Sequence, residues 1–559
     1  MRTGPSAGLA LAALLLAALL LAALLAPLAG LVWSSFAPPW MPDGTPAGPG
    51  LHHHIRAWQA PGAVAAIGNA LRFALGSALL ATLLGALAAW LYERTRLPGR
   101  RLLALAMLAP LFVPGALYSY AWVLLASPRI GVLNLPFAAP PFNVYGHAGM
   151  AWVEGLHATP MVFLLAAAML RSLDPERELA AQVSGASLWQ TATRITLPML
   201  APVLGSAFLL VFIRAVGTFE VPAMLGLPAG IDVISSRIFQ ALRDHPGETG
   251  PAAAYAVALL VLTVLAIAIH ERLVRARLPL AAQAFGGDPG QRLELGRARL
   301  PLGALALSLS VLVALLPLLA VLWSSVQPYY AVPGAQALQR LTLSGFREVL
   351  SSGQVAEAAW NTARLAAAAA TLIMAAGLAA AWLMDRTAVA GRQALEPAIN
   401  SVLALPGVVL GIAILVFHTM LDTGLHGTGT ILLLAYLTRF LPYGLRYGRA
   451  ALGQVPRELE QAAHCSGAGS WQTLRRVTLP LLVPGLLAGW MFVAIVAIRE
   501  LSSALLLYTP GNEVVTVVFW QYWENGQLTE LSALSVLLAA FLLSIALLAN
   551  RLASRRPGR

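Results

Sequence analysis

Apolar residues in this chain occur in long runs separated by short polar segments. A run of about 20 residues is the length that a helix needs to cross a hydrocarbon core of roughly 30 Å. The pattern therefore predicts twelve membrane-spanning helices. We expect them near residues 7–33, 73–92, 102–126, 148–170, 199–222, 251–270, 301–324, 365–384, 397–418, 428–448, 483–503 and 531–550.

The first run, from Ala7 to Trp33, also resembles a signal peptide, because Arg2 precedes it and a small-residue segment near Pro27 is similar to a cleavage region. A signal core is typically about 7–15 residues long, and this run is nearly twice that length. We therefore expect an uncleaved first helix.

Composition agrees with a membrane protein: 58% of the 559 residues are hydrophobic, and 11% are charged, against about 25% in a soluble domain. This excludes a soluble enzyme. The net charge of +12 comes from arginines in short loops, which predicts membrane topology and no nucleic-acid partner. A single cysteine, Cys465, excludes a disulfide framework. The adjacent histidines 52–54 do not have the spacing of a metal site, so no metal is expected.

Arginine asymmetry predicts the orientation, because short cytoplasmic loops carry an excess of positive charge. The arginine-rich segments 93–101, 272–299 and 551–559 are therefore expected on the cytoplasmic side. An even number of crossings then places both termini there as well.

The two halves of the chain repeat each other at a constant offset. Before the end of the third span the matches are Asn69 with Asn361, Arg72 with Arg364, Trp90 with Trp382, Glu93-Arg94-Thr95 with Asp385-Arg386-Thr387, and Pro114-Gly115 with Pro406-Gly407. At a second, shorter offset Gly185 matches Gly467, Trp189-Gln190-Thr191 matches Trp471-Gln472-Thr473, and Pro198 matches Pro480. An even number of crossings separates equivalent segments, so the repeats are parallel.

The predicted fold class is an all-α polytopic membrane protein of two six-helix repeats, related by a pseudo-two-fold axis along the membrane normal. The first repeat is expected over 1–275 and the second over 301–559, with a cytoplasmic linker at 276–300.

One matched segment in each repeat, 176–198 and 458–480, predicts a helix, a glycine turn, a second short helix and a proline that begins the next span. Membrane insertion does not require such an elbow twice, whereas a peripheral partner that acts on both halves does.

These elbows resemble the "EAA" loop of ABC-transporter import permeases, which docks on the ATP-hydrolysing subunit. The resemblance implies coupling roles for Glu178, Ala180, Ala181, Gly185, Leu197 and Pro198, and for Glu460, Ala462, Ala463, Gly467, Leu479 and Pro480. The family's glutamate directly before Ala-Ala is replaced by Leu179 and Gln461. This departure affects the ion pair expected between the elbow and the ATPase subunit, and it leaves the expected docking of the helix unchanged.

The resemblance implies three partners: an ATPase dimer on the cytoplasmic side, an external substrate-binding protein, and the lipid bilayer of a bacterial inner membrane. The chain contains no lysine, so it cannot form a phosphate-binding P-loop. We expect no cofactor on this chain and place ATP and Mg²⁺ on the partner, so the chain is a transport subunit and not itself an enzyme.

Fused two-repeat permeases of this family resemble those for ferric iron, and segments 219–240 and 499–523 are similar to the ferric-iron pattern. Thiamine, a phosphonate or a polyamine is the alternative cargo. A secondary transporter driven by an ion gradient is the alternative of another class, and the two elbows argue against it.

Ionisable residues inside apolar spans are costly and usually face a partner charge or an aqueous path. Arg214, Glu220, Arg499 and Glu500 are in this position. We hypothesise that the two carboxylates line a translocation path, with the two arginines as counter-charges. The matched pairs Asn69 with Arg72 and Asn361 with Arg364, at the external start of two spans, are interpreted as interfacial anchors.

Overall fold

The structure is a computed structural model, and it describes residues 22–23, 25–37, 48–174, 176–245, 247–282, 292, 295–386 and 392–554. The beginning of the first predicted helix, and residues 283–291 and 293–294 of the predicted linker at 276–300, lie outside the described residues.

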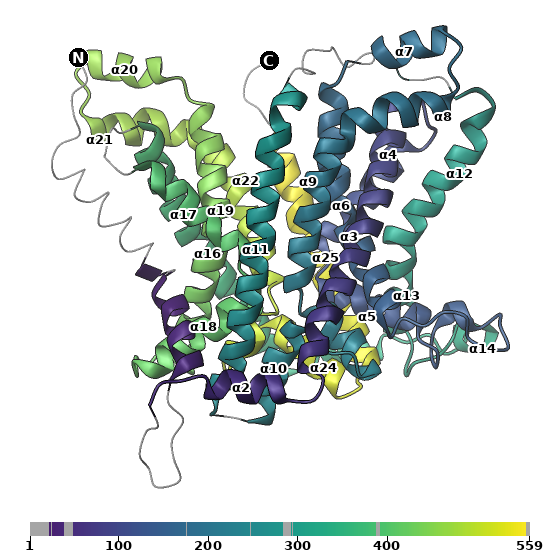
Figure 1. The fold of residues 1–559 in the computed structure, drawn as a ribbon, viewed down its shortest axis with the longest axis vertical. Helices are drawn as coiled ribbons and strands as arrows, with labels where there is room; N and C mark the ends of the chain where they lie inside the picture. Colours follow the sequence, from purple (N-terminus) through teal and green to yellow (C-terminus); the bar gives the residue numbers. More distant parts are fainter. Residues whose placement is uncertain are drawn as a thin grey trace. The chain divides into compact units, whose positions relative to one another are not determined.

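Long apolar helices dominate the described chain, because a helix satisfies every backbone N–H and C=O within one segment of a bilayer. The long helices are α3 (Ala63–Arg94), α6 (His147–Ser172), α9 (Leu197–Gly217), α11 (Thr249–Ala282), α16 (Gly353–Arg386), α19 (Gly429–Gly453), α22 (Leu479–Ile498) and α25 (Leu528–Ser554) (Figure 1). The shorter ones are α2 (His52–Gln59), α4 (Arg100–Leu108), α5 (Gly115–Ala126), α7 (Glu176–Val183), α8 (Leu188–Thr191), α10 (Ile234–Asp244), α12 (Arg299–Ser310), α13 (Leu316–Ser325), α14 (Ala335–Leu338), α15 (Ser344–Ser351), α17 (Leu395–Ser401), α18 (Gly407–Met420), α20 (Arg457–Cys465), α21 (Ser470–Thr473), α23 (Ala504–Leu507) and α24 (Val515–Glu524).

Eight helical segments among the described residues are long and apolar enough to cross a membrane, or nine if one bent pair counts as a single span. The all-α, multi-span fold class is therefore confirmed. The count of twelve crossings stays a prediction.

The span expected near 102–126 is bent, because the chain turns by 113° between Arg100–Phe112 and Gly115–Ala126. Pro114 causes the break: proline has no N–H to donate to the preceding turn, and its backbone is extended (φ −55°, ψ 144°). Pro406 adopts the same conformation (φ −57°, ψ 141°) immediately before α18. The duplication thus extends to an extended proline directly before a helix in each repeat.

The helices form two compact units, each assembled from separate stretches of the chain. One comprises 52–346 and 528–536, and the other comprises 1–51, 347–527 and 537–559. In the former, Tyr118 Oη on α5 donates a hydrogen bond to Val313 O, between α12 and α13, at 2.9 Å. In the latter, Gly30 lies against the ring of Phe417 on α18. Each unit therefore combines helices from both halves, and the predicted repeat boundaries stay a statement about sequence duplication.

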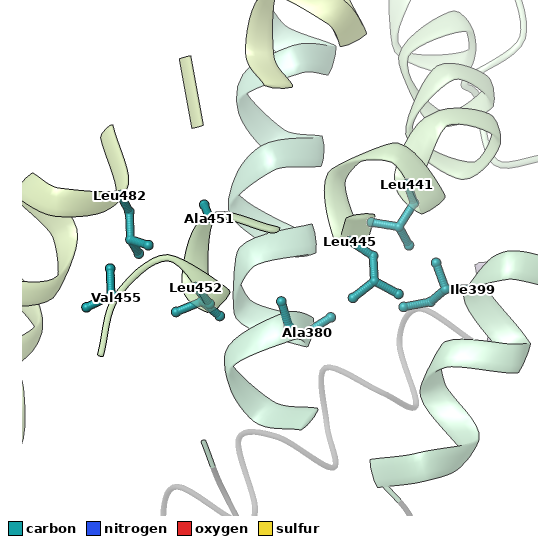
Figure 2. Packing of buried hydrophobic residues seen from close by; sticks show 9 residues of the cluster. Ala380, Ile399, Leu441, Leu445, Ala451, Leu452, Val455 and Leu482 are labelled. Atoms are coloured by element: carbon teal, nitrogen blue, oxygen red, sulfur yellow. The ribbon is translucent and has the colours of Figure 1, made fainter. Parts of the chain in front are cut away.

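A buried apolar cluster joins α16, α17, α19 and α22 (Figure 2). Small residues allow the helices to approach closely, since any side chain on Gly377 of α16 would collide with the backbone of Gly444 on α19. The cluster extends to Val455, in the segment that follows α19, through Leu452 of α19 and Leu482 of α22. This core supports the second elbow.

Candidate functional site

The first elbow has the conformation that its sequence predicts. Helix α7 is followed by Gly185, whose φ of +87° lies in the left-handed region that glycine tolerates without a steric penalty. Helix α8 then begins with a capping box, in which Ser187 Oγ accepts from Gln190 N at 3.2 Å and Gln190 Oε1 accepts from Ser187 N at 2.9 Å. A π-helical turn, Ala192–Thr196, leads directly into α9.

The second elbow repeats this geometry. Helix α20 is followed by Gly467 at φ +86°, and Gln472 Oε1 accepts from Gly469 N at 3.2 Å before α21. The π-helical turn Leu474–Thr478 leads into α22. The agreement in φ and in turn type confirms that the two elbows are copies of one structure.

The glutamate of the first elbow faces the protein interior. Glu178 is 3% exposed, its Oε2 lies 3.1 Å from Arg94 Nε at the end of α3, and its Oε1 accepts from Thr196 Oγ1 at 2.6 Å. Arg94 also donates to Leu173 O at 2.9 Å. This carboxylate therefore fastens the elbow to α3 and α9 and is not presented on the surface.

The glutamate of the second elbow has the same kinds of partner, an arginine and a threonine, at longer distances. Glu460 Oε2 lies 3.5 Å from Arg386 Nε, and Thr478 Oγ1 donates to Glu460 Oε1 at 3.2 Å. Arg386 also donates to Val455 O at 2.9 Å. The repeat matched Arg94 with Arg386, but nothing in that match indicated that these arginines hold the glutamates.

The first elbow exposes two large apolar side chains. Val183 is 90% exposed and Trp189 is 76% exposed. Cys465, at the position equivalent to Val183, is exposed as well. Of the other predicted coupling residues, Ala180, Gly185, Leu197, Pro198, Ala462, Gly467, Leu479 and Pro480 are exposed, and Ala181 and Ala463 are half-buried. Large exposed apolar side chains on a short helix are typical of an interaction surface.

Arg214, whose side chain is 41% exposed, contacts two buried residues of α6 in the first repeat. Arg214 Nη2 lies 3.5 Å from Glu154 Oε1 and 3.1 Å from His157 Nδ1, and Glu154 is 1% exposed. His157 Nε2 lies 3.1 Å from Val113 O. Because a guanidinium only donates and a carbonyl only accepts, the neutral imidazole with its proton on Nε2 satisfies both contacts. Sequence reasoning missed Glu154 and His157, although both lie inside a predicted span.

Glu220 is half-buried, and its carboxylate lies against Gly115 at the start of α5. His157 borders the same glycine. The only ion pair that the structure gives to Arg214, among the described residues, is with Glu154. The placement of Glu220 on a translocation path, with Arg214 and Arg499 as counter-charges, stays a prediction.

Glu500 in the second repeat pairs with Arg439 of α19, at 3.2 Å between Oε2 and Nε. Its Oε1 accepts from Ser503 N and Ser503 Oγ, both at 2.9 Å. Arg439 borders Gly407 at the start of α18, as His157 borders Gly115 in the first repeat. Arg439 was missed by the sequence analysis, which expected Arg499 as the counter-charge. An arginine inside an apolar span was the signal that could have found it.

No group of three or more His, Cys, Asp or Glu side chains in the described part of the chain is arranged to hold a metal ion.

Two copies of one helical repeat, each with a glycine elbow and a charged group near a helix that starts after a proline, define a duplicated membrane permease fold. The chain belongs to the family of binding-protein-dependent transport system inner membrane components, whose sequence profile matches residues 81–278 and 373–555. Each match contains one elbow. The predicted family and the identification of the chain as a transport component are thereby confirmed.

The chain is also similar to permeases named for ferric transport. The chain is 28% identical over 382 residues to the putative ferric transport system permease protein FbpB 1 of Haemophilus influenzae, a match that covers 67% of this chain and 59% of that protein. It is 23% identical over 465 residues to the Fe(3+)-transport system permease protein FbpB 2 of the same organism, covering 82% of this chain and 84% of that protein. The match to the first relative thus spans less than two thirds of its length.

Among solved structures, a bacterial ABC transporter involved in the import of the acidic polysaccharide alginate aligns with 47% of this chain and 98% of its own, at 17% identity and a TM-score of 0.39.

Proposed function

We propose that this chain is the membrane permease subunit of an ATP-driven importer, that it forms the translocation pathway, and that it couples to a separate ATPase through its two elbows. The observation that carries the proposal is the paired elbow: in each copy a glycine turn is held from inside by an ion pair of the elbow glutamate, and the first copy exposes large apolar side chains. ATP and Mg²⁺ belong to the partner in this scheme, and an external binding protein delivers the cargo.

The internal contacts of the elbow explain how a push on its surface would reach the membrane helices. Glu178 is bonded both to Arg94 at the end of α3 and to Thr196 at the entry to α9. A displacement of α7 therefore acts on two spans at once. The partner shifts the conformational equilibrium only if its contacts with the elbow differ between the two states.

Ferric iron is the cargo that we propose, because the chain resembles permeases named for ferric transport over most of its length. The half-buried carboxylate of Glu220 and the buried carboxylate of Glu500 are the groups that we place on the path, and Arg439 joins Arg214 and Arg499 as a counter-charge. The external binding protein would determine most of the selectivity. A thiamine, phosphonate or polyamine importer remains the alternative.

We place both termini and both elbows on the cytoplasmic side, following the arginine-rich loops. The chain's single cysteine offers a direct test, since Cys465 is exposed on the second elbow. A membrane-impermeant maleimide should label it in inverted vesicles and not in right-side-out vesicles. Labelling from the outside would reverse the topology and contradict the coupling role.

Affinity purification from native membranes in mild detergent tests the importer assignment. We expect recovery of an ATPase subunit in fixed stoichiometry, and we expect Trp189→Ala to reduce that recovery because it removes the largest exposed side chain of the first elbow. Trp360→Ala is the matched control, since Trp360 is 66% exposed near the start of α16 and far along the chain from either elbow. Recovery of the chain alone, with uptake that follows an ion gradient, would favour the secondary-transporter alternative.

A further inference from the structure

A cavity of about 360 Å³ lies in the second repeat, at the end of α16 and α19 opposite to the second elbow. Its polar lining consists of Asn361 and Arg364 of α16, Thr430 of α19, and Asn512 in the loop before α24. Leu365 and Leu433 contribute to an apolar wall. None of the residues that line the cavity carries a negative charge.

The N-terminus of α19 opens into this cavity. The helix begins at Gly429, and its N-cap residue, Thr428, makes no side-chain capping hydrogen bond; its hydroxyl donates to Leu425 O at 2.7 Å. Gly429 and Thr430, the first two residues of the helix, line the cavity. A helix of 25 residues with uncapped N–H groups presents the positive end of its dipole to whatever occupies this space.

Asn512 contributes an unsatisfied donor. Its side chain is buried, with 9% exposed, and its Oδ1 accepts from Thr509 N at 2.7 Å, which fixes the orientation of the amide. Nδ2 has no hydrogen-bond partner in the described structure. A buried N–H without an acceptor is unfavourable, so a ligand with acceptor oxygens would satisfy it.

Arg364 supplies the charge. It is exposed to the cavity and is steadied by a hydrogen bond from Nη2 to Asn361 Oδ1 at 3.3 Å. The carboxylate next to Asn512 in sequence, that of Glu513, accepts a hydrogen bond from Gly511 N at 2.8 Å and is not part of the lining. The guanidinium is therefore available for an anion.

The first repeat differs at the two positions that make this cavity. His147 occupies the place of Gly429, and it lies 3.0 Å from Asn69 Oδ1, the counterpart of Asn361. Ile231, which cannot donate a side-chain hydrogen bond, occupies the place of Asn512. At these two positions the second repeat has a glycine where the first has a large side chain, and a hydrogen-bond donor where the first has an apolar side chain.

We propose that this cavity binds a phosphate group, carried either by free phosphate or by the headgroup of a phospholipid. Phosphate oxygens match the planar donors of Arg364, the uncapped helix N-terminus and the free amide of Asn512. The apolar wall fits the organic part of a phosphate ester, and Arg364 directly precedes a predicted membrane span. The proposal extends the anchor role expected for Arg364 and does not depend on the transport proposal.

Calorimetric titration of the delipidated full chain in detergent tests the site, with inorganic phosphate and dihexanoyl phosphatidylglycerol as separate probes and dihexanoylglycerol as the probe without phosphate. We expect saturable binding of a phosphate-bearing probe and none of dihexanoylglycerol. Binding of inorganic phosphate identifies free phosphate as a source, and binding of phosphatidylglycerol alone identifies the lipid.

Two variants should each weaken binding about tenfold or more, the loss expected for a charge-assisted hydrogen bond. Arg364→Gln removes the charge. Gly429→His fills the cavity with the side chain of the first repeat, and a Cβ added at Gly429 meets no atom within 4 Å. Arg72→Gln, at the equivalent position of the first repeat, is the control and should leave affinity unchanged. Absence of saturable binding, unchanged affinity in Gly429→His, or equal weakening by Arg72→Gln would overturn the proposal.

Discussion

Replacement of Glu178 by glutamine should loosen the first elbow from the membrane helices. The wild-type carboxylate is 3% exposed, lies 3.1 Å from Arg94 Nε and accepts from Thr196 at 2.6 Å. Removing one partner of a buried ion pair costs about 3–5 kcal/mol, because the remaining charge stays buried without compensation. Glutamine keeps the size of the side chain and can still accept from Thr196, so we expect about 3 kcal/mol, the lower end of that range.

Hydrogen exchange measured by mass spectrometry reports this loss locally. A tenfold change corresponds to about 1.36 kcal/mol, so protection of the amides in α7 and α8 should fall roughly 100-fold. The twin substitution, Glu460→Gln, should have a smaller effect, since Glu460 is 19% exposed and its ion pair is longer, at 3.5 Å. Glu176→Gln is the matched control, because Glu176 is exposed on the same short helix.

The ranking is what tests the reasoning. We expect Glu178→Gln to exceed Glu460→Gln, and both to exceed Glu176→Gln. If exchange in α7 and α8 were the same in Glu178→Gln as in the wild type, the buried pair would not hold the elbow in place.

Three further predictions concern the turn and the charged groups. Gly185→Ala places a side chain at φ +87°, which costs about 1–2 kcal/mol. In proteoliposomes this variant should raise the number of ATP molecules hydrolysed per cargo imported. Gly68→Ala is the control and should leave that ratio unchanged, because a Cβ added at Gly68 meets no atom within 4 Å. Gly115→Ala makes a methyl group meet the carboxylate at the flexible end of Glu220, which can move aside, so the thermal unfolding midpoint in detergent should fall by no more than the lower end of the roughly 1–3 kcal/mol cost of overpacking; a larger fall would show that this carboxylate is held in place. Glu220→Gln combined with Glu500→Gln should slow uptake in a folded complex, and a wild-type rate would remove both carboxylates from the proposed path.

Features that depend on the residues of a single segment, or on the matching of two segments, could be predicted from the sequence alone. Run length and composition predicted an all-helical membrane protein, and matched residues at constant offset predicted its duplication. The elbows were also predictable, because Gly185 and Gly467 followed by short polar helices have a local conformational meaning, and both glycines have positive φ in the structure. The break at Pro114 could have been anticipated from the same kind of signal, since its twin Pro406 was part of the repeat.

The tertiary structure decided which side chains meet, because those contacts join segments that are distant in the chain. Glu178 is held by Arg94 and faces inward, and Glu500 is held by Arg439 and not by its sequence neighbour Arg499. The cavity lined by Arg364 and Asn512 likewise forms only where the starts of α16 and α19 meet the loop before α24. Hydrophobic periodicity reports the environment of one segment at a time, whereas ion pairs and cavities depend on the packing of several, and that packing is fixed only when the helices assemble.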